Sequence, residues 1–267
     1  MPLTLPMQHL FTPAGLEALQ SLMRRRPLLA FDFDGTLAPI VERPADARVS
    51  PAVSASLAAL AQRLPVAIVT GRGVDDVRGR LGFEPRFIVG NHGAEDGRDG
   101  SAVAAWVQAL DPLRQRLAAC ARDLLAVGVT VEDKGLSIAL HYRLALSPER
   151  AQKLIADLTT SHDAPLQIFG GKRVVNVTSA AAPDKSHAVH RLRVACGASC
   201  AFFAGDDVND EPVFASAGAG WLTVRVGRAD AFSHASYWLD DALEMATLLE
   251  RMVVLSPALP GAQGAIK

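Results

Sequence analysis

The stretch from Leu28 to Thr36 constrains the fold most, because an apolar run leads directly into two carboxylates and a glycine turn. Its sequence is Leu-Leu-Ala-Phe-Asp-Phe-Asp-Gly-Thr, so Asp32 and Asp34 are two residues apart. In a strand that runs into a loop, such residues lie on the same face and can approach one cation or one substrate. Two carboxylates this close repel unless a cation lies between them, and all-oxygen ligands favour magnesium over zinc. The alternative is an Asp-Gly turn whose acids only cap backbone groups.

The composition is that of an ordinary globular protein without bulk affinity for polyanions. A chain of 267 residues suits one large domain or two modest ones, and 49% of its residues are hydrophobic against 21% charged. Lys and Arg total 27 against 28 for Asp and Glu, which gives a net charge of -1. We therefore expect a protein that binds neither nucleic acid nor membrane and whose charge recognition is local.

The three cysteines, Cys120, Cys196 and Cys200, lack the paired spacing of a metal site. Each is expected to be a small core residue in a reducing cytoplasm, with Cys196 and Cys200 on either side of a helix end and a strand start. Neither a signal peptide nor an apolar run of about 18 residues is visible. We therefore expect a cytoplasmic protein, and a monomer.

Short apolar runs that end in polar residues predict a parallel sheet. After the first run, Val66–Val69, Phe87–Val89 and residues 201–204 are continuously apolar, as in strands buried on both faces. Helices are predicted between them, at 13–23, 51–64 and after Pro183, and a further strand and helix at 221–226 and 241–254. Alternating strands and helices with polar residues at the strand C-termini indicate a doubly wound, Rossmann-like α/β sheet with its ligands along the carboxyl edge.

The pattern changes between residues 98 and 181. A long helix is predicted at 103–127, followed by a hairpin of strands 129–132 and 136–143. A helix at 148–161 and a second hairpin across Gly170 and Gly171 complete the segment. This α+β pattern predicts a cap domain at 98–181 inserted into a discontinuous core of residues 1–97 and 182–267.

Four polar sets fall at a strand end or a helix start. They are Asp32 with Asp34, Thr70, Lys185, and the group Asp206, Asp207 and Asp210. In this order they resemble the haloacid dehalogenase (HAD) superfamily of magnesium-dependent phosphotransferases, whose motifs are D-x-D-G-T, a Thr or Ser, a Lys and G-D-D-x-x-D.

The resemblance implies a role for each set that fits its chemistry. Phosphate monoesters react very slowly in water, so catalysis requires a nucleophile in line and neutralisation of the anionic charge. Asp32 would attack phosphorus, and Asp34 would protonate the leaving oxygen and then deprotonate water. Thr70 would hydrogen-bond the phosphoryl group, while Lys185 would hold it to the nucleophile by charge.

The same resemblance implies a Mg²⁺ site. Its ligands would be Asp32, the backbone carbonyl of Asp34 and a carboxylate of the third acidic set. Asp206 is expected to bind directly with Asp207 second, although their order stays open, and Asp210 would orient them.

Within the superfamily, most of the chain looks like trehalose-6-phosphate phosphatase. The segments that carry this resemblance are the insert after residues 90–95, the segments 131–134 and 141–143, the Gly-Lys-Arg-Val-Val strand and Gly-Asp-Asp-Val-Asn-Asp-Glu. The family hydrolyses trehalose 6-phosphate, and its cap domain closes over the disaccharide. The substrate-binding residues that this implies here are Gly71, Arg72, His92, Glu132, Arg143, Lys172 and Asn176. The alternative for the cap residues is a solvated sheet face.

The chain departs from the family pattern after Lys172. Asn176 stands where the family usually has Glu, residues 177–179 replace a basic-Pro pair, and Ser186 follows Lys185. An amide keeps an acceptor but loses a negative charge, so the departure bears on sugar selectivity and not on phosphoryl chemistry. Rival interpretations are a phosphatase for sucrose phosphate or a glycosyl-glycerate phosphate, and a non-catalytic sugar-phosphate sensor.

Overall fold

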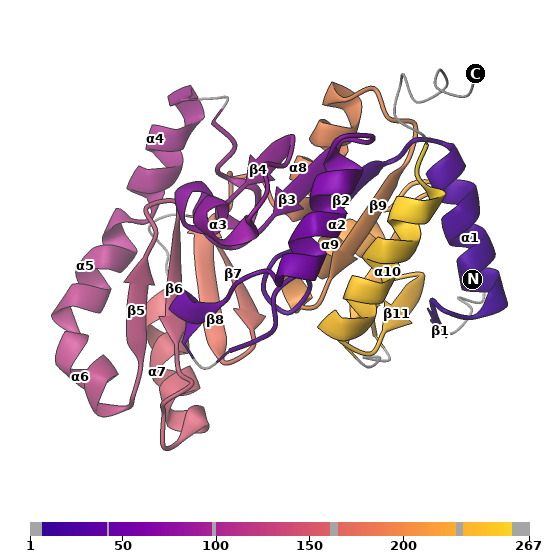
Figure 1. The fold of residues 1–267 in the computed structure, drawn as a ribbon. Helices are drawn as coiled ribbons and strands as arrows, with labels where there is room; N and C mark the ends of the chain where they lie inside the picture. Colours follow the sequence, from indigo (N-terminus) through magenta and orange to yellow (C-terminus); the bar gives the residue numbers. More distant parts are fainter. Residues whose placement is uncertain (1–6, 42, 98–99, 161–164, 228–231, 258–267) are drawn as a thin grey trace, which may run out of the picture.

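The computed structural model describes residues 7–41, 43–97, 100–160, 165–227 and 232–257 and contains two β-sheets (Figure 1). The larger is entirely parallel, with strand order β1-β11-β10-β9-β2-β3-β4. Its strands are β1 Gln8–His9, β2 Leu28–Phe31, β3 Val66–Val69, β4 Phe87–Val89, β9 Ala201–Gly205, β10 Leu222–Val226 and β11 Tyr237–Leu239. The doubly wound core predicted from the apolar runs is confirmed, while β1 and β11 at one edge were not predicted.

Helices cover both faces of this sheet because its central strands are apolar on both sides. Leu29 and Phe31 of β2 pack with one group of helices, and the alternate residues Leu28 and Ala30 pack with the other. The first group is α1 Pro13–Arg24, α2 Pro51–Ala61, α3 Val74–Leu81 and α10 Ala242–Leu255; the second is α8 Lys185–Ala195 and α9 Glu211–Ala215. Sequence patterns did not predict α3 and α9.

The predicted helix starts are confirmed by their caps. Thr12 Oγ1 accepts a hydrogen bond from the Gly15 amide at 3.2 Å, and Ser50 Oγ accepts one from the Val53 amide at 3.3 Å. The end predicted for α2 at residue 64 is wrong, because the helix stops at Ala61. The chain turns there into β3.

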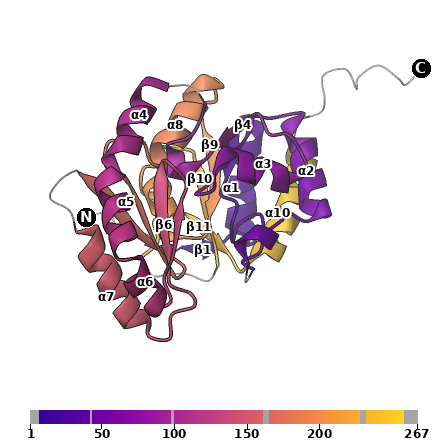
Figure 2. The ribbon, with the colours of Figure 1, turned by 90° about the vertical axis from the view of Figure 1, so that its left-hand side faces the viewer.

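The smaller sheet is antiparallel, in the order β5-β6-β8-β7. Its strands are β5 Thr130–Asp133, β6 Ser137–His141, β7 Leu166–Gly171 and β8 Val174–Ser179. In Figure 2, helices α4 Gly100–Ala109, α5 Asp111–Ala119, α6 Ala121–Ala126 and α7 Pro148–Thr159 lie beside this sheet and away from the larger one. Because side chains alternate along a strand, Ile138 and Leu140 of β6 pack on the helices, while Ser137 and His141 face the opposite way.

Two predictions in this segment are wrong. The single helix expected at 103–127 is three helices, because Pro112 near the start of α5 has no amide to continue a helix and Cys120 leaves helical geometry with φ −101° and ψ 16°. The second hairpin turns at Lys172 and Arg173 rather than at two glycines, which pair within β7. The end predicted for α7 at residue 161 lies outside the described residues.

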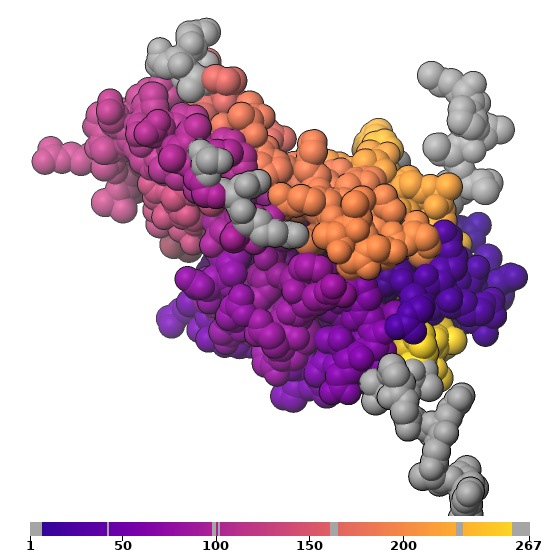
Figure 3. Space-filling view, turned by 90° about the horizontal axis from the view of Figure 1, so that it is seen from above, coloured from indigo at the N-terminus to yellow at the C-terminus, as the bar shows by residue number. Residues whose placement is uncertain are grey.

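In the space-filling view of Figure 3, the part of the chain around α4 to α6 occupies the upper left. Cys196 caps the end of α8 and Cys200 precedes β9, as predicted, and both cysteines are free. Among the described residues, no helix combines the length and apolar character needed to cross a membrane.

Candidate active site

The floor of the site is a buried lysine held between two carboxylates. Asp32 follows β2, and Lys185 is the first residue of α8, on the neighbouring layer. Lys185 Nζ donates to Asp32 Oδ1 at 2.8 Å and to Asp210 Oδ1 at 2.7 Å. Burial alone would lower the pKa of Lys185, but Asp210 and Asp32 raise it above its ordinary value, so the side chain is a permanent cation.

The loop after β9 brings the third acidic set to the same place. Asp210 Oδ2 accepts hydrogen bonds from the amides of Asp206 and Asp207, both at 3.0 Å. It therefore fixes the loop that presents the two preceding carboxylates. Gly35 is required opposite this loop, because a Cβ there would lie 1.9 Å from Asp206 Oδ2.

The carboxylates fit a divalent cation. One oxygen each from Asp32, Asp206 and Asp210 lie within 4.8 Å of one another. Burial raises the pKa of Asp32 well above its ordinary value, with Lys185 opposing and the other two acids adding to the rise. Burial likewise raises the pKa of Asp206 to about 6, although Lys172 opposes it. A dense set of buried oxygen donors carrying excess negative charge is a chemical match for a hard divalent metal, which HAD phosphatases generally use.

Arg72 follows β3 and binds Asp34 through both carboxylate oxygens. Its Nε and Nη2 donate to Oδ2 and Oδ1, each at 2.7 Å, while Nη1 donates to Asp76 at 2.9 Å. Burial opposes the charge, but the Asp34 and Asp76 contacts raise the pKa of Arg72 further. Thr70 is fully buried, and its Oγ1 accepts from the Arg72 amide at 3.2 Å, so it shapes this turn.

A strained turn after β4 places His92 in the site. Asn91 and His92 both have positive φ, at 47° and 58°, in the 3₁₀ turn Asn91–Gly93. Gly71 allows the approach, because a Cβ there would lie 2.3 Å from the His92 ring. Burial first, then Lys185 and Lys134, lower the pKa of His92 well below its ordinary value, so the ring is neutral. The His92 ring packs edge-on against the ring of Phe169 in β7, with 4.9 Å between the ring centroids.

The smaller sheet covers this floor with polar side chains. Glu132 of β5 binds His141 at 2.9 Å and lies 3.6 Å from Lys134. The His141 hydrogen bond lowers the pKa of Glu132, with burial opposing and Lys134 adding to the effect. From the hairpin tip, Lys172 forms an ion pair with Asp206, which ties the two sheets together across the site.

A cavity of about 380 Å³ lies between the two sheets. Nearly all of the site residues predicted from sequence line it: Asp32, Asp34, Gly71, Arg72, His92, Glu132, Arg143, Lys172, Asn176, Lys185, Asp206 and Asp207. Thr70 and Asp210 lie behind this wall. Sequence reasoning missed Lys134, His141 and Asp76, which also line it. Strand alternation could have indicated His141, which lies on the same face of β6 as Ser137.

The sequence matches the family model of trehalose-phosphatases over residues 30–226. The chain belongs to the trehalose-phosphatase family. It is 31% identical over 261 residues to the trehalose-phosphate phosphatase of Mycobacterium tuberculosis, a match that covers 90% of this chain and 65% of that protein. It is also 33% identical over 218 residues to an uncharacterized glycosyl hydrolase of the same species, covering 76% of this chain but only 16% of that protein. The chain thus spans less than two thirds of these relatives.

Two solved structures share the fold of this chain. The C-terminal domain of Candida albicans trehalose-6-phosphate phosphatase matches with a TM-score of 0.77 at 20% identity, over 94% of this chain and 99% of that one. A trehalose-6-phosphate phosphatase related protein matches with a TM-score of 0.69 at 23% identity, over 85% and 97%. These matches confirm the HAD-like fold with its separate antiparallel sheet.

Proposed function

We propose that this chain is a Mg²⁺-dependent phosphatase that hydrolyses trehalose 6-phosphate to trehalose and phosphate through an aspartyl-phosphate intermediate. The observation that carries the proposal is the cavity itself. Its floor holds Asp32, Lys185 and a cluster of carboxylates, while its roof presents cations, a carboxylate and an amide from a second sheet. The floor suits phosphoryl transfer, and the roof suits a hydroxyl-rich group.

Lys185 prepares Asp32 for attack. Because the lysine occupies Oδ1, we assign Oδ2 as the oxygen that forms the bond to phosphorus while the bond to the sugar oxygen breaks. The ammonium lies beside the position of the phosphoryl group, where it offsets negative charge in the transition state. Thr70 shapes the adjoining turn. The hydrogen bond from its hydroxyl to the phosphoryl group, expected from sequence, is part of the proposal.

Asp34 is assigned both proton transfers. It gives a proton to the leaving sugar oxygen, and then takes one from the water that attacks the aspartyl phosphate. Arg72 fixes the direction of this carboxylate by donating to both of its oxygens. We therefore assign Arg72 a positioning role in addition to the substrate contact expected from sequence.

Asp32, Asp206 and the Asp34 carbonyl are the proposed magnesium ligands, with Asp207 second and Asp210 holding the loop. When bound, Mg²⁺ neutralises the clustered carboxylates and the phosphoryl oxygens, which otherwise repel one another. Oxygen donors without histidine or cysteine favour magnesium among the divalent metals.

Sugar recognition is assigned to the inserted segment, which we take as a cap domain at 98–181 on a core of residues 1–97 and 182–267. Glu132 and Asn176 reach the cavity from its strands, Arg143 from the loop that follows β6, and Lys172 from the turn between β7 and β8. Each sugar hydroxyl left unpaired in a closed site costs about 1–3 kcal/mol, so such groups give selectivity. Three free cysteines suit a reducing compartment, and we propose that the protein acts as a cytoplasmic monomer.

One observation favours a second sugar phosphate as the substrate. Asn176 is 5% exposed and lines the cavity at the position where a carboxylate is usual in the family. A phosphate of sucrose or of a glycosyl glycerate remains the rival substrate on the same chemistry. A non-catalytic sensor is disfavoured, because a binder has no need for the Asp34 carboxylate.

A substrate panel tests the proposal. Phosphate release with Mg²⁺ is measured for trehalose 6-phosphate, sucrose 6-phosphate, a glycosyl-glycerate phosphate and p-nitrophenyl phosphate. We expect the highest kcat/KM for trehalose 6-phosphate. A preference for another sugar phosphate would transfer the proposal to that substrate, and failure to turn over any of them, the aryl ester included, would reject the phosphatase assignment.

A further inference from the structure

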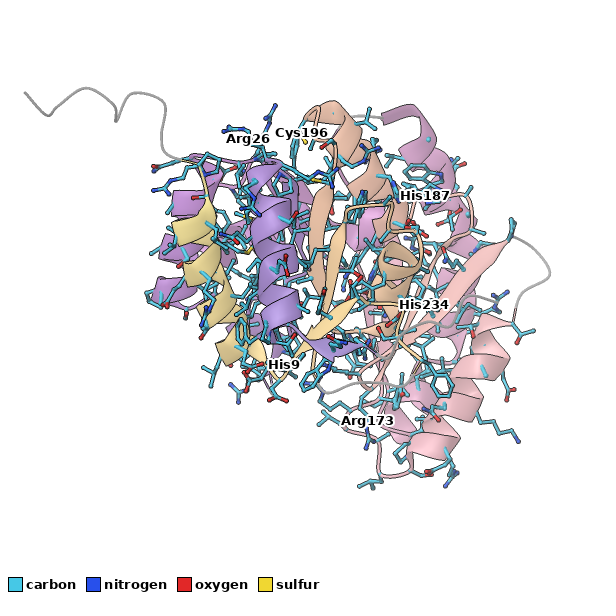
Figure 4. All side chains as sticks on the ribbon, turned by 90° about the vertical axis from the view of Figure 1, so that its right-hand side faces the viewer. His9, Arg26, Arg173, His187, Cys196 and His234 are labelled. Atoms are coloured by element: carbon cyan, nitrogen blue, oxygen red, sulfur yellow. The ribbon has the colours of Figure 1, made fainter. Side chains whose placement is uncertain are left out.

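A second cleft, at the end of the parallel sheet opposite the active site, is lined by four arginines. Arg25 and Arg26 precede β2, Arg63 precedes β3 and Arg86 precedes β4, so the cleft lies at the amino ends of these strands. Its volume is about 530 Å³, and none of the described residues that line it is acidic. In Figure 4, Arg26 and Cys196, both lining residues, lie together at the top of the molecule.

The four guanidinium groups have only neutral partners among the described residues. Arg25 donates to the Gly220 carbonyl at 3.4 Å, and Arg26 donates to the Arg63 carbonyl at 3.1 Å. Arg86 lies over the ring of Phe87, which leaves its N–H edge available. Among the described residues, none of the four arginines forms an ion pair with a carboxylate.

Helix ends account for part of this charge but not for all of it. The C-caps of α1, α2 and α8, which are Arg25, Gln62 and Cys196, line the cleft, and Arg63 donates to the Val253 carbonyl at the end of α10. Each helix C-terminus carries about −0.5 charge, so four ends supply about −2 against about +4 from the arginines. The cleft therefore has a residual charge of about +2.

Arg25, Arg26 and Arg86 are exposed, but Arg63 and Arg26 each show a feature that bears on this charge. Arg63 Nε is buried with no hydrogen-bond partner among the described residues, although Nη1 of the same group is bound to Ser256 at 2.8 Å. Arg26 adopts φ 53° directly after a helix, a position where glycine is far less strained. Glycine would be less strained at this position, so the arginine is present despite its backbone cost.

We propose that this cleft binds a phosphate-type dianion, at a site separate from the catalytic cavity. A dianion matches the residual charge, and the guanidinium fork matches phosphate oxygens in geometry. Inorganic phosphate and the phosphate group of a sugar monoester share this chemistry. The proposal does not depend on the substrate or on the catalytic roles assigned above.

Calorimetric titration of the whole chain with inorganic phosphate tests the site, with EDTA present to weaken binding at the catalytic carboxylates. The test variant is Arg26→Gly/Arg86→Ala, in which glycine also relieves the backbone. Arg24→Ala is the matched control, because this neighbouring arginine does not line the cleft. A Lys version, Arg26→Lys/Arg86→Lys, keeps the charge and guards against a loss caused by misfolding.

We expect wild type and Arg24→Ala to bind phosphate alike, the Gly/Ala variant to lose at least about tenfold in affinity, and the Lys variant to keep most of it. Raising the salt concentration should weaken this binding. Glucose 6-phosphate competing for the same site would point to monoesters, and its failure to compete would point to free phosphate. Equal affinity in wild type and the Gly/Ala variant, or no binding beyond the catalytic cavity, would overturn the proposal.

Discussion

Arg72 holds both carboxylate oxygens of Asp34 through two parallel hydrogen bonds of 2.7 Å. Lysine cannot reproduce this fork, so Arg72→Lys should leave Asp34 free to rotate away from the leaving oxygen. Because acid–base catalysis contributes about 10²–10⁴-fold, we expect kcat on trehalose 6-phosphate to fall about 10- to 100-fold, a larger change than that in KM. Arg80→Lys is the control, since Arg80 binds Asp76 but not Asp34. Equal effects of the two changes would show that the fork does not position Asp34.

Asp32→Asn should abolish turnover while the protein stays folded, because an amide of similar volume cannot attack phosphorus. We expect less than about a thousandth of the wild-type rate, a loss of about 4 kcal/mol in transition-state stabilisation. Steady-state rates and circular dichroism measure activity and folding together. Residual turnover well above that level in folded protein would exclude a covalent role for Asp32.

Removing divalent metal should stop the reaction, and magnesium should restore it. Asp32 and Asp206 share one buried cluster with Asp210, so their combined negative charge repels a phosphate dianion unless a metal ion offsets it. The measurement is phosphate release after EDTA treatment and dialysis into Mg²⁺ or Zn²⁺. Better recovery with zinc than with magnesium would contradict the magnesium assignment.

Lys172→Ala should damage trehalose 6-phosphate turnover selectively. If the ammonium grips the sugar from the hairpin tip, kcat/KM should fall by about 1–3 kcal/mol, while p-nitrophenyl phosphate, which has no sugar, should hardly change. Arg173→Ala, at the next position of the same turn, is the control, because Arg173 does not line the cavity. Since Lys172 also pairs with Asp206, equal losses on both substrates would mean that it supports the phosphate site instead.

His92 should make the fold sensitive to mild acid. Burial lowers the pKa of His92 in the folded state below its ordinary value of about 6.5. Below about pH 6.5 the imidazole therefore binds a proton in the unfolded chain but stays neutral in the folded one. Stability should therefore fall as pH drops from about 6.5, by at most about 1.4 kcal/mol per pH unit. His92→Asn tolerates the left-handed backbone and should lose this sensitivity. The measurement is the free energy of unfolding of wild type and of His92→Asn between pH 5 and 8. The stability of wild type relative to the variant should decrease toward pH 5. A difference that stays constant with pH would contradict the lowered pKa of His92.

The sequence by itself placed the chemical groups on the fold. Asp32, Thr70 and Asp206 each follow a continuous apolar run, which predicts a buried parallel strand. The carboxyl ends of such strands meet at one edge of the sheet, so the three residues are expected at that edge. Lys185 was placed in the same way, as the first residue of a helix on the layer beside them. These are local patterns, and the topology rules of parallel sheets convert them into proximity.

Only the tertiary structure decided which of these groups pair. Arg72 was expected from the family resemblance as a substrate contact, but its bond to Asp34 joins residues 38 positions apart. Lys172 reaches Asp206 because the hairpin turns two residues later than the glycines suggested. The clustering of four arginines at the far end of the sheet likewise joins four separate segments. Such contacts depend on side-chain direction and on the packing of distant elements, and neither propensity nor periodicity encodes these.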